Sequence, residues 1–281
     1  MSEEAVLYDH PGPKAKVRNR ILTIIFGVLI VALLYWIYSQ LDEKGQFAAL
    51  LWQPFTQWAT WDNFILPGLW GTLKAAAVGM VLALIFGLIF SVGRLSERRW
   101  VSVPAGAIVE FFRAVPLLLM IFFVFYGLGV PTFWAVVIGL TLYNGSVLAE
   151  AFRAGIRAVP PGQSEAAYAV GMRKSGVMRY ILLPQAARAM LPVIVSQLVV
   201  LLKDTALGYI VAYPELLQLG INVLSANYFN VIQAAIVIAV IYIVINSLLT
   251  ALAGWLERRT RRSGIRVPRG ARAGTVVEPQ G

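Results

Sequence analysis

The chain has 281 residues, of which 59% are hydrophobic and 14% charged, against about 45–50% and about 25% in an ordinary soluble domain. The apolar residues form runs of about 20, which as helices cross a hydrocarbon core of about 30 Å, so a water-soluble core is excluded. The chain has no cysteine, and its one histidine, His10, lies in a polar segment, which excludes disulfides and argues against metal or histidine-based catalysis.

The net charge of +10 indicates membrane topology rather than a polyanionic partner. In a soluble protein such a charge would suggest nucleic-acid binding, but here most basic residues lie in the polar segments between apolar runs. We therefore expect no nucleic-acid partner.

The apolar runs predict an all-α, polytopic membrane protein with about six transmembrane helices. The second run carries Gly79, Ala83 and Gly87 at intervals of four residues, a small face that lets membrane helices approach closely. We expect this face to pack against another helix, with a substrate path as the alternative. The runs cover approximately residues 21–41, 66–93, 103–128, 133–152, 191–213 and 229–256.

The basic residues also predict the orientation. If the segment from Lys14 to Arg20 is cytoplasmic, most of the 24 Lys and Arg residues fall in cytoplasmic segments, whereas the outer loops hold Lys44 alone. Both termini are therefore expected in the cytoplasm. A signal peptide is a poor interpretation of the first run, because about 20 polar residues precede it.

The chain is expected to divide into four segments. Trp52, Trp58 and Trp61 follow the first run, and their amphipathic rings suit the headgroup region of the membrane. The C-terminal segment is rich in arginine, proline and glycine, which predicts a disordered tail attracted to anionic lipid. The segments are a cytoplasmic N-terminal tail (1–20), an extra first transmembrane helix with an outer interfacial segment (21–65), a transmembrane core (66–256) and a basic tail (257–281).

The longest interior loop, residues 157–188, predicts two short helices against the cytoplasmic face. Two prolines and a glycine at 160–162 stop the preceding helix and favour a new one over 163–170. Gly171 is placed to end that helix in a left-handed turn, and Ser175 is placed to cap a second helix that ends before Pro184.

The first of these short helices has the features of a docking element. Glu165 is expected in its first turn, where a negative charge is favourable. Ala166 and Ala167 are expected to leave a smooth surface that another protein can cover closely.

These residues resemble the EAA loop of ABC-importer permease subunits, E-A-A-x3-G-x9-I-x-L-P. The resemblance makes residues 66–256 a permease core and implies that the loop is a coupling helix between the fourth and fifth membrane helices. Such a helix docks in a groove of the cytoplasmic ATPase subunit; the alternative is an ordinary amphipathic surface helix. Every fixed position of the motif is filled, by Glu165, Ala166, Ala167, Gly171, Ile181, Leu183 and Pro184.

Three further stretches resemble permeases for polar amino acids of the glutamate, glutamine, histidine and arginine type. They are residues 110–118, 150–156 and 202–207. The extra first helix and basic tail resemble the glutamate branch. The chain departs from that pattern at Ala114 and Ala154, where glycine is common, and this weakens the assignment of substrate more than that of family.

Ionisable residues in or beside the apolar runs are candidates for a low-affinity substrate path. A charged group at bilayer depth costs about 2.5–3.5 kcal/mol on insertion scales, so it normally has a partner or faces water. An amino acid brings a carboxylate and an ammonium, which basic and acidic side chains can bind. The candidates are Arg113, Glu150, Lys203 and Asp204.

Purely structural roles compete with this interpretation. Arg113 is three residues from Glu110 and can pair with it along one helix. Glu150 and Arg153 can instead hold the start of the coupling loop. Lys203 and Asp204 are adjacent and point in different directions, so pairing across helices, with Glu150 or Arg113, is favoured over pairing with each other.

The energy source must lie outside the chain if transport is active. No G-x4-G-K-[ST] phosphate loop is present, and Lys174-Ser175 is the one Lys followed by Ser or Thr. We therefore expect a non-catalytic subunit with no cofactor of its own. A self-contained ion-coupled amino-acid transporter is the alternative; an intramembrane enzyme lacks the necessary groups.

The resemblance implies a set of partners in a bacterial cytoplasmic membrane. These are two copies of a cytoplasmic ABC ATPase that bind ATP and Mg, a second permease chain that is identical or homologous, and an extracytoplasmic substrate-binding protein. The implied substrate is a polar amino acid such as glutamate, which moves by alternating access.

Overall fold

The computed structural model describes residues 12–262, which form helices and no strand. The long helices are α1 (Pro13–Glu43), α4 (Leu66–Arg94), α5 (Arg99–Ala114), α6 (Leu117–Leu128), α7 (Thr132–Arg157), α10 (Leu183–Asp204) and α12 (Val231–Arg262). Shorter elements join them: α2 (Ala49–Trp52), η2 (Gln53–Thr56), α3 (Trp58–Thr60), η3 (Trp61–Ile65), α8 (Pro161–Ala169), α9 (Lys174–Gly176), η4 (Val177–Leu182), η5 (Thr205–Val211), η6 (Gln218–Val223) and α11 (Leu224–Tyr228).

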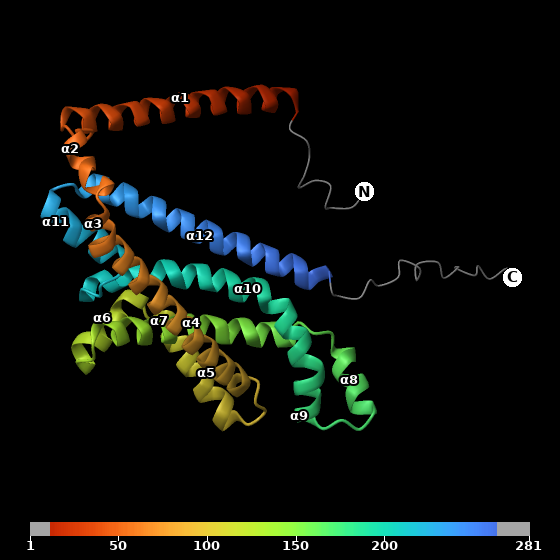
Figure 1. The fold of residues 1–281 in the computed structure, drawn as a ribbon. Helices are drawn as coiled ribbons and strands as arrows, with labels where there is room; N and C mark the ends of the chain where they lie inside the picture. Colours follow the sequence, from red (N-terminus) through yellow and green to blue (C-terminus); the bar gives the residue numbers. More distant parts are fainter. Residues whose placement is uncertain (1–11, 263–281) are drawn as a thin grey trace.

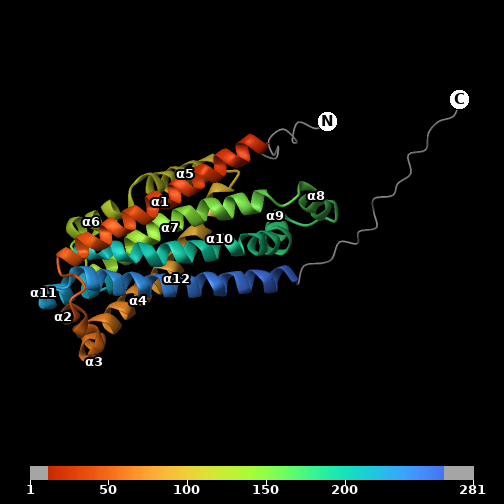
Figure 2. The same cartoon turned by 90° about the horizontal axis from the view of Figure 1, so that it is seen from above.

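The long helices run between two ends of the bundle. α8, α9, the start of α1 and the end of α12 lie at one end, which we call the α8 end (Figure 1). α2, α3 and α11 lie at the other, the α11 end (Figures 1 and 2). The two ends of the described chain therefore lie on the same side of the bundle, as they must when a chain crosses a membrane an even number of times.

Within residues 12–262, five helices are long and apolar enough to cross a membrane, and the bent pair of α5 and α6 counts as a sixth, broken span if the two cross as one. The expectation of one continuous helix over 103–128 is wrong, because α5 and α6 meet at 99°. Val115 is extended at the break (φ −80°, ψ 126°), since a residue before proline is disfavoured in the α conformation and Pro116 follows.

Helix α1 stands apart from the rest of the bundle. None of its residues is buried, and Figure 1 shows it joined to the other helices only at the α11 end. The connecting segment is fixed there, because buried Asn230 donates to the carbonyl of Leu51 (3.0 Å) and buried Gln233 donates to that of Gln46. The core therefore forms without α1.

The ends of the terminal helices differ from the expected segments. α1 begins at Pro13, inside the expected N-terminal tail, because proline suits the first turn of a helix. α12 continues to Arg262, so residues 257–262 of the expected disordered tail are helical. Residues 1–11 and 263–281 lie outside the described residues.

The centre of the bundle is the contact between α4 and α7. Gly79, Ala83 and Gly87 are all buried, which agrees with the helix-packing interpretation of this face. A Cβ atom added to Gly87 would lie 2.9 Å from Cβ of Leu148 and 3.2 Å from the backbone nitrogen of Ala149. Only glycine permits this approach, so the spacing of small residues sets the distance between the two helices.

Replacing Gly87 with valine should therefore destabilise the protein. Overpacking a close contact costs about 1–3 kcal/mol, and we expect a lower thermal unfolding midpoint in detergent. Gly27→Val is the matched control, because Gly27 lies in α1 with nothing within 4 Å of an added Cβ. Equal midpoints for the two variants would contradict this account of the contact.

Candidate functional site

Helix α8 ends in the left-handed turn that the sequence predicts. Gly171 has φ +81°, which L side chains rarely adopt. Its N–H donates to the carbonyl of Tyr168 (2.9 Å), and the N–H of Met172 donates to that of Ala167 (3.1 Å). These two bonds form a Schellman motif, which satisfies the last carbonyls of α8.

The exposed face of α8 differs in part from the expected one. The helix already begins at Pro161, so Glu165 lies beyond its first turn, and that expectation is wrong. Ala166 is exposed but Ala167 is buried, and α8 packs against η4, where Val177 is also buried. Ala166 therefore belongs to the outer surface and Ala167 to the inner contact.

The second short helix does not end before Pro184. Lys174 begins a helical stretch that passes through η4 and α10 up to Val211, and Ser175 makes no capping hydrogen bond at its start. The π-helical turn η4 lies directly before Leu183 and Pro184, which begin α10. Pro184 therefore lies inside a continuous helical stretch, directly after a π-helical turn. Ile181, half-buried in η4, and exposed Leu183 and Pro184 thus lie on the segment that α8 packs against, not on α8 itself.

Five charged side chains gather near the α8 end, and we call them the inner ion-pair network: Arg94, Glu110, Arg113, Glu150 and Arg153. Nη2 of Arg94 lies 3.1 Å from Oε1 of Glu110, and its Nη1 lies 2.9 Å from Oε2 of Glu150. Arg153 donates to Glu150, with Nε 3.1 Å from Oε2. Arg113 is 3.7 Å from Glu110. Sequence reasoning named four of these residues but missed Arg94, which joins them.

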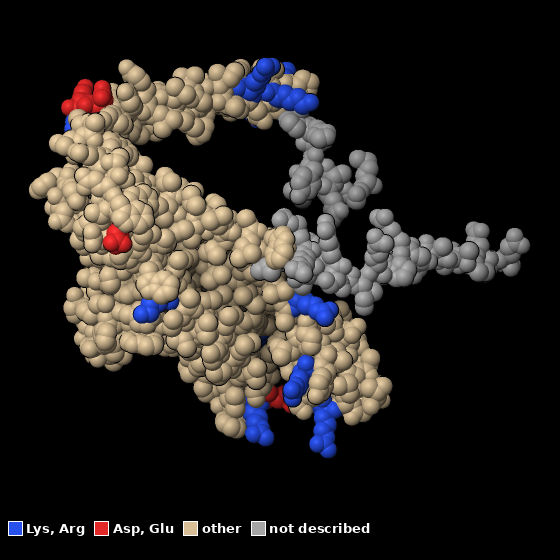
Figure 3. Space-filling model, viewed as in Figure 1, with Lys and Arg blue, Asp and Glu red and all other residues tan. Residues whose placement is uncertain are grey.

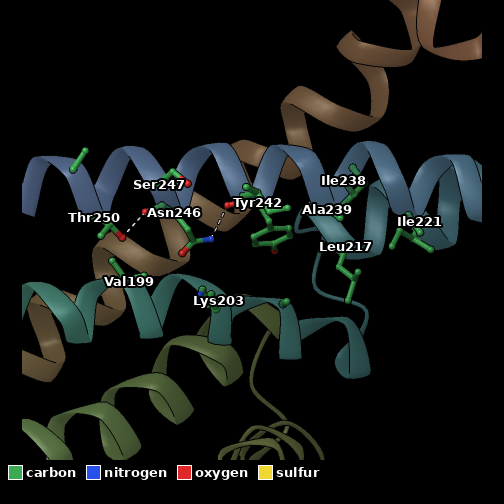
Figure 4. Close-up of a pocket in the computed structure, with 14 residues that line it drawn as sticks. Val199, Lys203, Leu217, Ile221, Ile238, Ala239, Tyr242, Asn246, Ser247 and Thr250 are labelled. Carbon is green, nitrogen blue, oxygen red and sulfur yellow. Dashed lines mark hydrogen bonds between the residues drawn. The ribbon is translucent and has the colours of Figure 1, made fainter. Parts of the chain in front are cut away.

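The other two candidates lie on the half of α10 near the α11 end. Lys203 is exposed and lines an open groove of about 910 Å³ between α10, η6 and α12, together with Tyr242, Asn246 and Thr250 (Figure 4). Asp204 is half-buried next to Asn144 of α7. The two adjacent residues therefore face different surroundings, as expected.

The structure does not bring the four candidate path residues together. In the described part of the chain, no ion pair joins Lys203 or Asp204 to Arg113 or Glu150. Buried Asn144 instead accepts a hydrogen bond from Gln197, which joins α7 to α10. The expected pairing across helices from α10 to Glu150 or Arg113 is absent here.

A second polar cluster, which sequence reasoning missed, surrounds Glu215 near the α11 end. Its buried carboxylate accepts from the N–H groups of Leu217 (2.8 Å) and Gln218 (2.6 Å) and from the hydroxyl of Tyr242 (3.1 Å). The backbone beside it also packs on α4, where Thr72 accepts from the N–H of Leu216 (3.1 Å). This carboxylate caps the helical turn that leads toward α12.

Burial raises the pKa of Glu215 to about 7, and the residue lies between the spans Lys174–Val211 and Val231–Leu252. Because the pKa is raised on folding, the stability contributed by the neutral carboxyl is present below its ordinary range and is lost as pH rises through about 7.

We therefore expect the wild-type unfolding midpoint to be lower at about pH 8 than at about pH 6. Glu215→Gln, which imitates the neutral acid, should remove most of this difference. Glu97→Gln is the control, since the hydrogen bond and charge of Lys174 lower the pKa of Glu97 and move its titration out of this range. A Glu215→Gln variant with the wild-type pH dependence would contradict the assignment.

Membrane-length helices, a bent helix pair and a short helix–turn–helix at one end define a multi-pass membrane protein. The chain belongs to the family described as binding-protein-dependent transport system inner membrane component, whose family model matches residues 79–262. Members of this family are permease subunits, so the chain is a multi-pass membrane permease.

Relatives of known sequence are amino-acid permeases. The glutamate transport system permease protein GluD of Corynebacterium glutamicum is 47% identical over 230 residues, which cover 79% of this chain and 84% of GluD. The arginine transport system permease protein ArtQ of Bacillus subtilis is 33% identical over 204 residues, which cover 70% of this chain and 93% of ArtQ.

Solved structures share the fold. An amino acid ABC transporter crystallised with histidines matches with a TM-score of 0.66 and 30% identity, over 69% of this chain and 92% of that one. The inward-facing MetNI methionine ABC transporter matches with a TM-score of 0.61 at 20% identity, over 69% and 95% of the two chains. The fold is therefore that of ABC-transporter permeases.

Proposed function

We propose that this chain is the permease subunit of an ATP-driven importer for glutamate or a similar polar amino acid. The observation that carries the proposal is the helix α8 with its left-handed Gly171, at the position and spacing of the EAA motif. The identity of 47% to the glutamate permease GluD supports the choice of substrate.

In this proposal α8 is the coupling helix. Its outward side presents Glu165, Ala166 and the large apolar side chains of Tyr168 and Val170, which are 48% and 77% exposed. Apolar groups so exposed beyond the ends of the membrane helices favour a protein partner. The partner is a cytoplasmic ATPase, which binds ATP and Mg and performs the hydrolysis, while this chain binds no cofactor and has no catalytic role.

The charge distribution supports a bacterial cytoplasmic membrane with the α8 end inside. Most of the Lys and Arg side chains visible in Figure 3 gather at the α8 end and at the start of α1, whereas the sides of the bundle are almost free of charge. Basic residues concentrate on the cytoplasmic side of membrane proteins. Both described chain ends then lie in the cytoplasm.

The assembly needs further subunits. One chain supplies one α8, so two copies of the ATPase require a second permease chain, identical or homologous to this one. An extracytoplasmic substrate-binding protein delivers the amino acid at the α11 end. Alternating access then moves the substrate along the helices toward the α8 end.

The groove at Lys203 is the best-placed part of the substrate path. Among the residues that the structure describes, the side chain of Lys203 has no hydrogen-bond or ion-pair partner, and its ammonium can bind a substrate carboxylate. Asp204 is the next residue in the chain, but it lies beside Asn144 and does not line the groove. Arg113, whose side chain is 39% exposed, is a second group that can contact the substrate, nearer the α8 end. Glu150 is a weaker candidate, because Arg94 and Arg153 already pair with it.

ATP-dependent uptake tests the proposal. The chain, co-expressed with its ATPase and second permease and placed in liposomes, should import glutamate only with ATP and the binding protein present. Uptake by this chain alone, driven by an ion gradient, would replace the proposal with an ion-coupled carrier.

Gly171→Asp should abolish substrate-stimulated ATP hydrolysis while the permease stays in the membrane. A side chain in the left-handed conformation costs about 1–2 kcal/mol and deforms the end of α8. Gly162→Asp is the matched control, because it adds the same charge to the same helix at a position where the φ angle is ordinary and space is open. Retained stimulation in Gly171→Asp would contradict the coupling role of α8.

Lys203→Met should raise the KM of glutamate uptake about tenfold or more, the effect of losing a charge-assisted hydrogen bond of about 1.5–3 kcal/mol. Lys74→Met is the control, since Lys74 lies outside the groove with its Nζ 4.8 Å from the ring centroid of Phe133. An unchanged KM at normal membrane abundance would remove Lys203 from the path.

A further inference from the structure

Arg94 occupies a special place in the inner ion-pair network. It is the last residue of α4, yet its guanidinium contacts carboxylates on two other helices, Glu110 of α5 and Glu150 of α7. Its side chain is 14% exposed, the least exposed of the network, where screening by water is weakest. The planar fork of an arginine suits this double contact, which a single ammonium cannot reproduce.

The other two arginines of the network make only local pairs. Arg113 pairs with Glu110 and Arg153 with Glu150, in each case three residues apart on one helix. Within the described residues of the network, the ion pairs of Arg94 are the ones that join different helices. Its removal would break the ion pairs from α4 to α5 and to α7 and leave both local pairs intact.

A second contact ties the same region to the coupling segment. The turn between α4 and α5, residues 95–98, carries Glu97, which forms an ion pair with Lys174 at the start of α9. In chain order, α7 comes directly before α8, and α9 comes directly after α8. The end of α4 and the turn after it therefore contact the chain on both sides of α8: Arg94 pairs with Glu150 before α8, and Glu97 forms an exposed ion pair with Lys174 after it.

The broken span starts directly at this turn. α5 begins at Arg99, and its far end meets α6 at the extended residue Val115. The N–H of Val115 still donates to the carbonyl of Phe111 (3.1 Å), but Pro116 after it has no N–H to continue the helical hydrogen bonds of α5. A displacement of α8 that pulls on the turn therefore moves α5 as a lever about Val115. Arg113, the candidate path residue, lies two residues from this hinge.

We propose that Arg94 is a positioning residue that transmits movement of the coupling segment to the broken span α5–α6. The inference rests on the proposed function, since it needs an ATPase to move α8. It goes further by naming the contact that carries the movement: one guanidinium shared by Glu110 and Glu150, supported by the pair of Glu97 with Lys174.

Arg94→Gln tests the proposal in the complete transporter in liposomes. We expect normal membrane abundance and basal ATP hydrolysis, but at least a fivefold loss of substrate-stimulated hydrolysis and of uptake per ATP. Arg94→Lys should be intermediate, because it keeps the charge without the fork. Arg98→Gln is the matched control, as Arg98 lies in the same turn, is exposed and has no ion pair among the described residues.

Measuring uptake per ATP beside membrane abundance and basal hydrolysis distinguishes a role of Arg94 in coupling from a role in stability alone. A purely structural role would lower abundance and basal hydrolysis together and leave uptake per ATP unchanged, which would overturn the proposal. An Arg94→Gln transporter whose ATP hydrolysis is stimulated by substrate as strongly as that of the wild type would also overturn the proposal. If the wild-type complex itself shows no substrate-stimulated hydrolysis, the proposed function fails instead.

A second measurement does not depend on removing Arg94. The chain has no natural cysteine, so Glu97→Cys with Lys174→Cys creates one defined pair of thiols in it, and each single variant is a control. A short bifunctional thiol reagent then ties the turn to α9. If the turn moves with the coupling segment, the tied transporter keeps its stimulated hydrolysis and uptake. Loss of both, restored by cutting the link, would show that the two parts move separately and would overturn the proposal.

Discussion

The close contact between α4 and α7 is the interaction on which the rest of the structure depends. Lipid offers no hydrophobic driving force between membrane helices, so they associate through tight van der Waals packing where small residues allow it. Gly87 against Leu148 provides that fit. With the two helices in place, the end of α4 brings Arg94 to Glu150, and its start brings Thr72 to the Glu215 turn. One packing contact thus positions polar clusters at both ends of the bundle.

Prolines act differently in three places because their neighbours differ. Pro116 breaks a span, since Val115 before it is extended and α6 starts afresh. Pro161 begins α8, where a missing N–H is tolerated, whereas Pro184 lies inside a continuous helical stretch directly after the π-helical turn η4. The surrounding contacts decide whether the chain bends at a proline. The bend at Val115 and the start of α8 are the two features that give the permease a lever and a docking helix.

Polar groups in this bundle divide into those that satisfy each other and those left free. Asn144 and Gln197 pair inside the core, and Glu215 is satisfied by two backbone N–H groups and Tyr242. Lys203 has no such partner among the described residues and faces an open groove. Because an unpaired charge in a membrane is costly, a side chain of this kind is a better indication of function than a buried pair.

The sequence alone determined most of the membrane segments, the position of α8 and the left-handed turn at Gly171, because these depend on local properties: apolar length, proline and glycine. It did not determine which side of α8 is covered, as the burial of Ala167 shows, nor that Arg94 joins the inner network. It also missed Glu215. These features depend on contacts between residues far apart in the chain. Another such contact joins Tyr213 and Gly71, which are 142 positions apart yet share a hydrogen bond of 2.9 Å. Only the packing of the helices decides such contacts, since no local pattern records which helix faces which.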